Sequence, residues 1–236
     1  MDSGCGNMDL FKTPVRFLIA AASMSGKSTF MIQIIKNADK LFTGHINQIV
    51  WATGNKDYIP KELEAMPKVT VVEGIPNVES LQPHSFIVLD DLQMDNLKDI
   101  CKLFTVTSHH RNISTFFLVQ NLFWTSPLFR TISLNASHIV LFKSIRDKNQ
   151  IVHLARQVFP EFTKSFMEVY KQATNEPYSY LIIDLSQTCS PVLRIKTDIF
   201  NDNYFITYTL GSTLDKHSNQ EVIGSAKVQS CTNFIQ

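Results

Sequence analysis

Short, nearly unbroken runs of apolar residues recur along the chain, separated by stretches with helical periodicity. Runs of this kind are typical of strands in a parallel sheet that is covered on both faces. Because such strands alternate with helices, the pattern predicts an α/β fold with a central, mostly parallel sheet flanked by helices. The predicted strands are residues 17–22, 49–53, 69–72, 86–89, 115–119, 139–142 and 180–185.

Two stretches, residues 28–42 and 92–104, place apolar residues on one helical face, which predicts amphipathic helices. Residues 162–173 are expected to add a late helix after Pro160. A length of 236 residues with 44% hydrophobic content suits one domain, which we expect to span residues 11–210. Residues 1–10 and the tail 211–236 are polar with few large apolar side chains, so we expect both to be disordered.

The segment 21–28 has the sequence Ala-Ala-Ser-Met-Ser-Gly-Lys-Ser and joins the first predicted strand to the clearest helix. Gly-Lys-Ser in this context predicts a P-loop, although Ala21 stands where the pattern has its first glycine. In such a loop Lys27 reaches the β and γ phosphates, and the Ser28 hydroxyl is a ligand of Mg²⁺. The predicted contacts to ATP are Ala22, Ser23, Met24, Ser25, Gly26, Lys27, Ser28 and Thr29.

Two adjacent carboxylates, Asp90 and Asp91, follow the apolar strand 86–89, as in a Walker B element. Asp90 is predicted to hold Mg²⁺, while Asp91 acts as the general base that polarises the attacking water. A strand that simply stops at a solvated Asp-Asp turn is the alternative. The P-loop upstream favours the catalytic interpretation.

The strand 115–119 ends in Gln120 and Asn121. In P-loop ATPases that hydrolyse with a second acid, the strand after Walker B inserts between the P-loop and Walker B strands. The fold is therefore predicted to be RecA-like, of the additional-strand type. Gln120 would sense the γ-phosphate or orient the water, and Asn121 is a weaker candidate for the same role. A polar cap on a buried strand is the alternative explanation.

Longer strings of residues closely resemble the packaging ATPases of the FtsK-HerA superfamily, especially those of polinton-like and adintovirus-like DNA viruses. The resemblance spans roughly residues 15–200 and implies an ATPase that translocates double-stranded viral DNA into a preformed capsid. It also implies a homo-oligomeric ring, a pentamer or hexamer, at a capsid or portal vertex in an infected cell or virion. The matching strings are residues 89–92, 108–114, 118–123, 130–135, 139–143, 146–147, 154–160 and 180–184.

Ring motors usually complete each active site with an arginine from the neighbouring subunit, which stabilises charge on the transferred phosphoryl group. Relatives place it between the Walker B and glutamine strands, where this chain has Arg111. Arg130 and Arg146 are alternatives, and each of the three could instead pair with a carboxylate or a DNA phosphate. Most relatives carry Glu at the position of Asp91, which is one methylene shorter and could slow hydrolysis.

The net charge of +1 gives no global basic field, so DNA contacts must come from local loops or from an assembled ring. The loop 143–148 is a candidate, although taken alone it is better explained as a solvated turn with three cations and one acid. We expect His109 and His110 to bind no metal, because adjacent side chains on an extended segment point in opposite directions.

No apolar run approaches the roughly 20 residues of a membrane span. The cysteines, Cys5, Cys101, Cys189 and Cys231, have no metal-ligand spacing and suggest reduced thiols.

Three other functions use similar residues. A P-loop kinase for small molecules fits the length, but a second acid and a glutamine favour hydrolysis over transfer to an acceptor. A cellular FtsK- or HerA-type DNA translocase or helicase differs only in the viral strings. A nucleotide-binding assembly protein without turnover is the third alternative, because Ala21 and Asp91 depart from the usual pattern.

Overall fold

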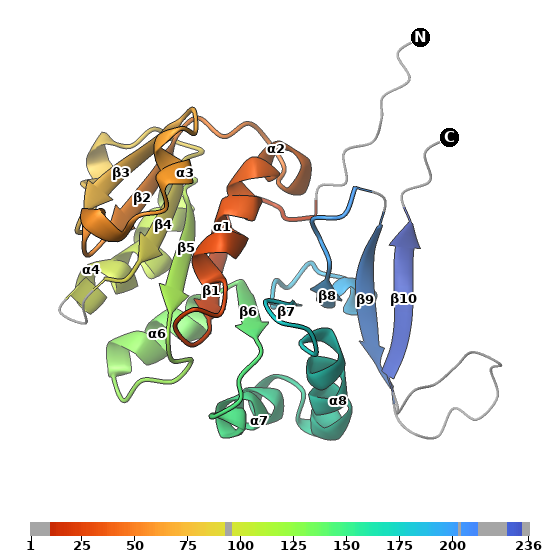
Figure 1. The fold of residues 1–236 in the computed structure, drawn as a ribbon. Helices are drawn as coiled ribbons and strands as arrows, with labels where there is room; N and C mark the ends of the chain where they lie inside the picture. The colour runs from red at the N-terminus through yellow and green to blue at the C-terminus, as the bar shows by residue number, and fades with distance from the viewer. Residues whose placement is uncertain (1–9, 93–95, 203, 212–225, 233–236) are drawn as a thin grey trace, which may run out of the picture.

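The computed structural model describes residues 10–92, 96–202, 204–211 and 226–232. These residues contain a 10-stranded sheet in the order β10-β9-β8-β7-β6-β1-β5-β4-β2-β3 (Figure 1). All the strands predicted from the apolar runs are present. The strands are β1 Arg16–Ala20, β2 Ile49–Thr53, β3 Val69–Glu73, β4 Phe86–Asp90, β5 Ser114–Val119, β6 His138–Phe142, β7 Tyr180–Asp184, β8 Ile195–Thr197, β9 Tyr204–Leu210 and β10 Ala226–Thr232.

The sheet has a parallel half and an antiparallel half. Strands β6, β1, β5, β4, β2 and β3 are parallel neighbours, as the apolar runs predict. Strand β7 was expected in the parallel set but runs antiparallel to β6. Two consecutive helices, α7 and α8, separate these strands and pack against each other. The helix pair returns the chain to the edge where β6 ended, so β7 must run in the opposite direction.

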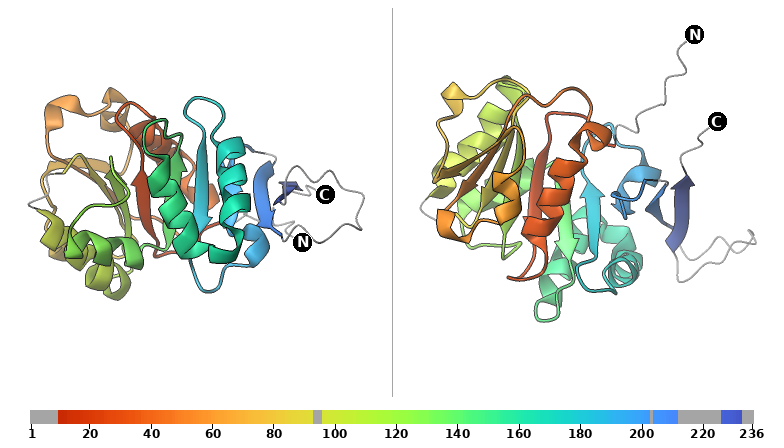
Figure 2. Two further views of the ribbon diagram at one scale, coloured as in Figure 1. Left: turned by 90° about the horizontal axis from the view of Figure 1, so that it is seen from below. Right: turned by 45° about the horizontal axis from the view of Figure 1, so that its top comes forward.

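Helices cover both faces of the parallel half (Figure 2). On one face α1 and α2 pack over the apolar cluster that contains Phe17 and Ile19, alternate residues of β1. On the other face α4, α6, α7 and α8 pack over the cluster that contains Leu18 and Ala20. The parallel strands other than β3, which lies at the edge of the sheet, are therefore buried on both sides. The helices are α1 Lys27–Lys36, α2 Ala38–Leu41, α3 Lys61–Glu64, α4 Leu97–Lys102, α5 Ser108–His110, α6 Pro127–Asn135, α7 Lys148–Val158 and α8 Thr163–Ala173.

Two predicted helices differ from the structure in detail. The stretch 28–42 is interrupted at Asn37, which separates α1 from α2 and bonds back to the Gln33 carbonyl. The stretch 92–104 forms α4 and then enters a π-helical segment, Leu103–Thr107, that leads into α5. His109 and His110 therefore lie on a short helix, and the expectation of an extended segment was wrong.

The expectation of a disordered tail over residues 211–236 needs correction for one segment. Ala226–Thr232 forms β10, which pairs antiparallel with β9 along its whole length. Backbone pairing of this kind does not require an apolar sequence, which explains why the polar composition concealed it. Residues 1–9, 212–225 and 233–236 lie outside the described part of the chain. Within the described part, no helix is long and apolar enough to span a membrane.

Candidate active site

The P-loop forms the connection between β1 and α1. Gly26 is the N-cap of α1 and has a φ of 93°, in the left-handed region that favours glycine. A Cβ atom at Gly26 would also lie only 3.1 Å from Cδ1 of Tyr178. The free N–H groups of the first turn of α1 adjoin this loop, which makes an anion-binding site. The predicted strand, loop and helix are therefore present in the required order.

Side chains from the P-loop and from β4 meet beside this helix terminus. The Ser28 hydroxyl donates to Oδ2 of Asp90 at 3.2 Å. Lys27 Nζ donates to the carbonyls of Ala21 at 2.6 Å and Ala22 at 2.9 Å. The hydroxyl and carboxylate are hard oxygen ligands on adjacent elements, and this donor set fits Mg²⁺.

Burial changes the protonation chemistry of both charged groups. Desolvation lowers the pKa of Lys27, and the nearby Asp90 and Asp91 carboxylates oppose that change. Desolvation likewise raises the pKa of Asp90, against the stabilising effects of the Ser28 hydrogen bond and the Lys27 charge. For both groups the effect of desolvation outweighs that of the neighbouring charges and hydrogen bonds of the described residues. A cation beside Asp90 and an anion beside Lys27 would therefore relieve a desolvation cost.

Asp91 leaves the end of β4 in a left-handed conformation with a φ of 51°. Its carbonyl oxygen lies against Gly54, the residue that follows the neighbouring strand β2. A Cβ atom at Gly54 would be 2.3 Å from that oxygen, so only glycine fits there. The sequence alone did not single out Gly54.

Strand β5 lies between β1 and β4, as predicted for the additional-strand type of P-loop fold. This order places Gln120, just after β5, beside the two acids. Gln120 and both acids line a cavity of about 280 Å³ together with Lys27 and Ser28 of the P-loop. Asn121 does not line this cavity. Asn121 instead accepts a hydrogen bond from the Phe123 N–H. The lining residues are Ser23, Met24, Lys27, Ser28, Trp51, Thr53, Asn55, Ile59, Asp90, Asp91, Leu118 and Gln120.

Five of these lining residues were not predicted as site residues from the sequence: Trp51, Thr53, Asn55, Ile59 and Leu118. Trp51 and Thr53 belong to β2, Asn55 and Ile59 follow it, and Leu118 belongs to β5. Strand β2 pairs directly with β4, which brings its carboxyl end beside the acids. Once that pairing is known, polar residues after strand 49–53 become candidates, but the sequence does not give the pairing.

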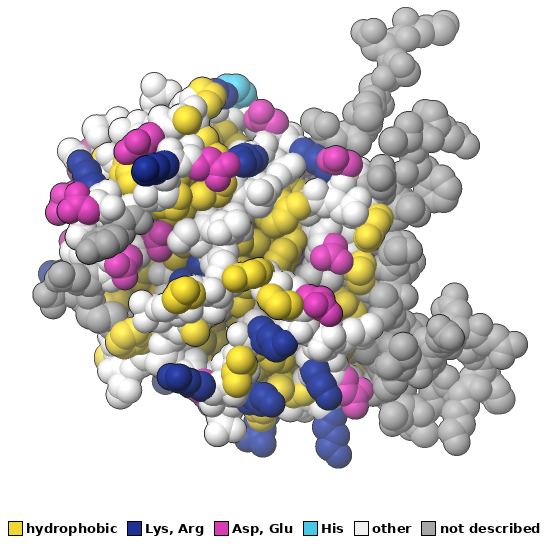
Figure 3. Space-filling model, in the orientation of Figure 1, with side chains coloured by type: hydrophobic (Ala, Val, Ile, Leu, Met, Phe, Trp, Pro, Cys, Tyr) yellow, Lys and Arg dark blue, Asp and Glu magenta, His cyan; other side chains and the backbone are white. Residues whose placement is uncertain are grey.

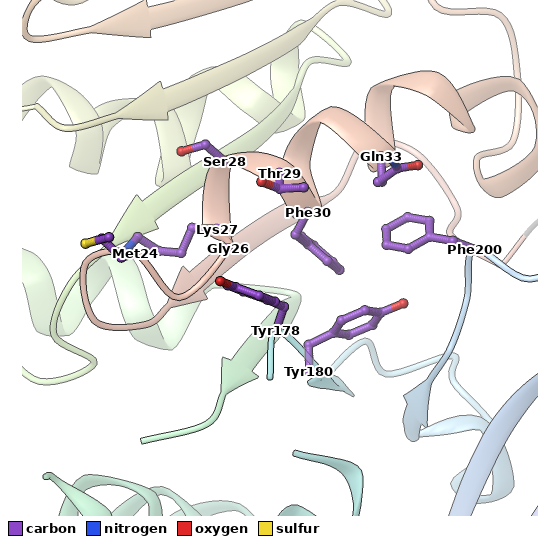
Figure 4. A pocket seen from close by; sticks show the side chains of 10 residues that line it. All are labelled: Met24, Gly26, Lys27, Ser28, Thr29, Phe30, Gln33, Tyr178, Tyr180 and Phe200. Carbon is purple, nitrogen blue, oxygen red and sulfur yellow. The ribbon is translucent and has the colours of Figure 1, made fainter. Parts of the chain in front are cut away.

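A second cavity of about 650 Å³ adjoins the P-loop on its other side (Figure 4). Aromatic rings from distant parts of the chain form its wall: Phe30 on α1, Tyr180 on β7, and Phe200 and Tyr178 in loops. The Phe30 ring centroid lies 4.7 Å from that of Tyr180 and 5.3 Å from that of Phe200. Tyr178 is 69% exposed and contacts Gly26. An aromatic wall beside a phosphate-binding loop suits a nucleobase, which stacks on such rings.

The three candidate arginines lie outside both cavities. Arg111 precedes the amino end of β5, whereas the site lies at the carboxyl end of this six-residue strand. A strand of that length spans about 20 Å. The Arg111 guanidinium donates to the backbone carbonyls of Glu79 at 3.2 Å and Leu81 at 3.1 Å. Arg130 on α6 and Arg146 in the loop after β6 are exposed.

Exposed cations gather at the edge of the sheet that carries the P-loop. Figure 3 shows Lys and Arg side chains in the region of α7 and α8. Lys143, Arg146 and Lys148 are exposed members of the loop 143–148, which follows β6, the parallel neighbour of β1. Lys143 Nζ donates to the Asn175 carbonyl at 2.7 Å. The loop candidate for DNA contact thus lies on the same edge as the P-loop.

Strand order and the Gly-Lys-Ser loop together define the class of fold, an α/β P-loop NTPase fold with the additional strand. No protein family model matches the chain. No curated protein matches it either. Among solved structures, the chain is similar to the genome packaging NTPase B204 from Sulfolobus turreted icosahedral virus 2 in complex with ATP-gammaS. The identity is 16%, the match covers 78% of this chain and 96% of that chain, and the TM-score is 0.49.

Proposed function

We propose that this protein is a magnesium-dependent ATPase that drives the packaging of double-stranded viral DNA into a capsid. The observation that carries the ATPase part is the single cavity that gathers Lys27, Ser28, Asp90, Asp91 and Gln120. These residues come from two adjacent strand ends, those of β4 and β5, and from the amino terminus of α1. They supply the phosphate, metal and water contacts that nucleotide hydrolysis requires.

In the proposed mechanism the aromatic cavity takes the base, and the P-loop N–H groups and Lys27 take the phosphates. Ser28 and Asp90 would hold Mg²⁺, which when bound neutralises charge on the phosphate oxygens. Gln120 orients a water molecule, and Asp91 accepts its proton as the water attacks the γ-phosphorus. The bond from the γ-phosphorus to the bridging oxygen breaks, which leaves ADP and inorganic phosphate.

The departure at Ala21 does not argue against turnover. Ala21 does not have a positive φ, so its backbone conformation does not require glycine. Its N–H donates to the Val119 carbonyl at 3.0 Å, and its carbonyl accepts from Lys27. The backbone conformation at this position therefore does not require glycine, which removes one argument for an inactive assembly protein.

Hydrolysis is favoured over kinase chemistry because Asp91 and Gln120 lie together where an attacking water must be bound.

The DNA and capsid parts of the proposal depend on the resemblance to viral packaging ATPases over residues 15–200. That resemblance also supports a ring of subunits within an infected cell, and it alone favours a packaging motor over a cellular translocase. The basic loop 143–148 is the proposed DNA contact within such a ring.

The test compares the wild-type protein with Lys27→Ala, measuring ATP hydrolysis with and without double-stranded DNA beside the oligomeric state. Loss of the Lys27 ammonium should remove nearly all turnover and leave the melting temperature within a few degrees, because Lys27 bonds only to loop carbonyls. Lys61→Ala, at an exposed lysine on α3, is the matched control and should hydrolyse ATP normally. If Lys27→Ala hydrolyses ATP at the wild-type rate, the assignment of the ATP site is wrong. If double-stranded DNA does not change the rate of ATP hydrolysis by the wild-type protein, the proposed role as a DNA-packaging motor is wrong.

A further inference from the structure

A third cavity, of about 890 Å³, lies at the opposite edge of the sheet from the P-loop. We call it the rear cavity. Arg16 begins β1 and His138 begins β6, so the cavity opens at the amino ends of these parallel strands. Hydroxyl side chains from the loop after β7, including Thr188 and Ser190, form another wall. The proposed ATPase mechanism uses none of these residues.

The acidic group that lines the rear cavity is already paired within the chain. Lys196 Nζ lies 3.2 Å from Oδ2 of Asp184, and His138 Nε2 lies 3.3 Å from the same oxygen. The Ser186 hydroxyl donates to the other oxygen at 2.5 Å. Burial lowers the pKa of His138. Desolvation acts to raise the pKa of Asp184, but the interactions with His138, Ser186 and Lys196 outweigh it and hold that pKa well below its usual range. The Asp184 carboxylate and the Lys196 ammonium therefore largely cancel each other.

The remaining basic side chains of the cavity form no ion pair with a carboxylate of the described residues. Nε of Arg16 is buried and bonds to no acceptor among the described residues. No carboxylate of those residues forms an ion pair with its guanidinium, although burial lowers its pKa. Lys12, which is exposed, and His109 on α5 line the same space. A partly buried guanidinium without a counter-ion costs free energy that a bound anion would recover.

We propose that the rear cavity binds a phosphate group, with Arg16 as its principal contact. A guanidinium presents its donors in a planar fork that matches two phosphate oxygens, and the Thr188 and Ser190 hydroxyls can donate to the others. Lys12 adds a second positive charge at the rim. A metal cation is disfavoured because the Asp184 carboxylate is occupied, and an apolar ligand is disfavoured because it would leave the buried Arg16 Nε without an acceptor. The phosphate can come from a DNA backbone or from a small phosphorylated solute.

The site is independent of nucleotide hydrolysis, so it can be tested in protein that does not turn over ATP. The first arm titrates inorganic phosphate calorimetrically into Lys27→Ala, in which the P-loop no longer competes for the anion. Arg16→Gln in that background should weaken phosphate binding about tenfold or more, because it removes a charge-assisted contact. Arg16→Lys should retain part of the affinity as a point charge. Arg156→Gln, at an exposed arginine on α7, is the matched control.

The second arm measures binding of a fluorescent DNA duplex to the full chain by anisotropy at several salt concentrations. If DNA supplies the phosphate, Arg16→Gln should weaken binding and reduce the slope of log affinity against log salt by about 1. If inorganic phosphate binds but Arg16→Gln leaves DNA binding unchanged, the ligand of the rear cavity is a small phosphorylated solute rather than DNA.

The proposal fails if neither probe binds, or if a folded Arg16→Gln binds both as the wild type does. If Arg16→Gln does not fold, Lys12→Gln decides the question, because Lys12 is exposed and its loss leaves the core intact. A reduced affinity for either probe then supports the site, and an unchanged affinity for both overturns it. Basal ATP hydrolysis should be the same in the Lys12 variant and the wild type.

Discussion

A Cβ atom on Gly54 would lie 2.3 Å from the carbonyl oxygen of Asp91, a separation that no other residue type can tolerate. The two residues follow β2 and β4, which are direct neighbours in the sheet. Asp91 also has a φ of 51°, in the left-handed region, which aspartate adopts more readily than most residues other than glycine. The Gly54 contact therefore helps to fix the backbone conformation of Asp91, the proposed general base, just after the end of β4.

We predict that Gly54→Ala lowers ATP turnover at least about tenfold by displacing Asp91. Overpacking costs about 1–3 kcal/mol, which lowers the Tm by several degrees in a domain of this size. Gly44→Ala is a matched control, since Gly44 has a φ of 84° but no neighbouring atom within 4 Å of the place that a Cβ would take. It should lose about 1 kcal/mol of stability and keep full turnover. Equal losses of turnover in both variants would show that general destabilisation, not the Asp91 contact, is responsible.

A second prediction concerns Asp90, whose pKa is raised by burial. Folding then favours the protonated carboxyl, so ionisation of Asp90 costs stability as the pH rises from the unfolded pKa through the folded one. Asp90→Asn should therefore melt at a higher temperature than the wild type near neutral pH without ligand, and should lose magnesium-dependent nucleotide binding. The difference in Tm should shrink as the pH falls, because the wild-type carboxyl then becomes neutral. A lower Tm at every pH would contradict this account.

Asp91→Asn should behave differently, because the amide cannot accept a proton from the attacking water. We expect near-normal binding of Mg-ATP and a fall in hydrolysis of about 10²- to 10⁴-fold. Nucleotide binding can be followed with a fluorescent ATP analogue, and hydrolysis by phosphate release. Loss of binding in Asp91→Asn, together with a harmless Asp90→Asn, would reverse the roles assigned to the two acids.

Tyr178 provides a test of the aromatic cavity. Removing its ring by Tyr178→Ala should raise the KM for ATP about 5- to 100-fold with little change in kcat, since base stacking contributes about 1–3 kcal/mol. Tyr178→Phe keeps the ring and should retain the wild-type KM. Tyr204→Ala, at an exposed tyrosine on β9, controls for the loss of an aromatic ring elsewhere. A normal KM in Tyr178→Ala would place the base outside this cavity.

Local patterns in the sequence predict the parts of the candidate site that depend on consecutive residues. The P-loop could be predicted because strand, loop and helix follow one another, and Asp90, Asp91 and Gln120 because each directly follows an apolar strand. The Gly54 contact and the aromatic wall could not be predicted, because they form between segments that only the strand order brings together. Tyr180 and Phe200, for example, belong to the part of the chain that begins with β7, whose antiparallel direction the sequence did not indicate.

The last prediction concerns Arg111 and separates a ring motor from a self-contained enzyme. Arg111 lies near the amino end of β5 and bonds to the carbonyls of Glu79 and Leu81, so it cannot serve the nucleotide site of its own chain from this position. A role in catalysis then requires that it reach the site of a neighbouring subunit. Arg111→Ala should in that case bind ATP normally and hydrolyse it about 10³-fold or more slowly, with or without DNA.

Because Arg111 also anchors the segment before β4, its loss can lower stability as well as activity, and a defect in the single variant is therefore ambiguous. Mixing Arg111→Ala subunits with Lys27→Ala subunits resolves the ambiguity. Each variant is inactive alone, yet some interfaces in a mixed ring pair an intact P-loop with an intact arginine. Partial recovery of turnover on mixing therefore demonstrates a shared site, which a purely structural role of Arg111 cannot produce. If mixed oligomers form and no turnover returns, the assignment to Arg111 is wrong, and Arg130 and Arg146 become the residues to test in the same way.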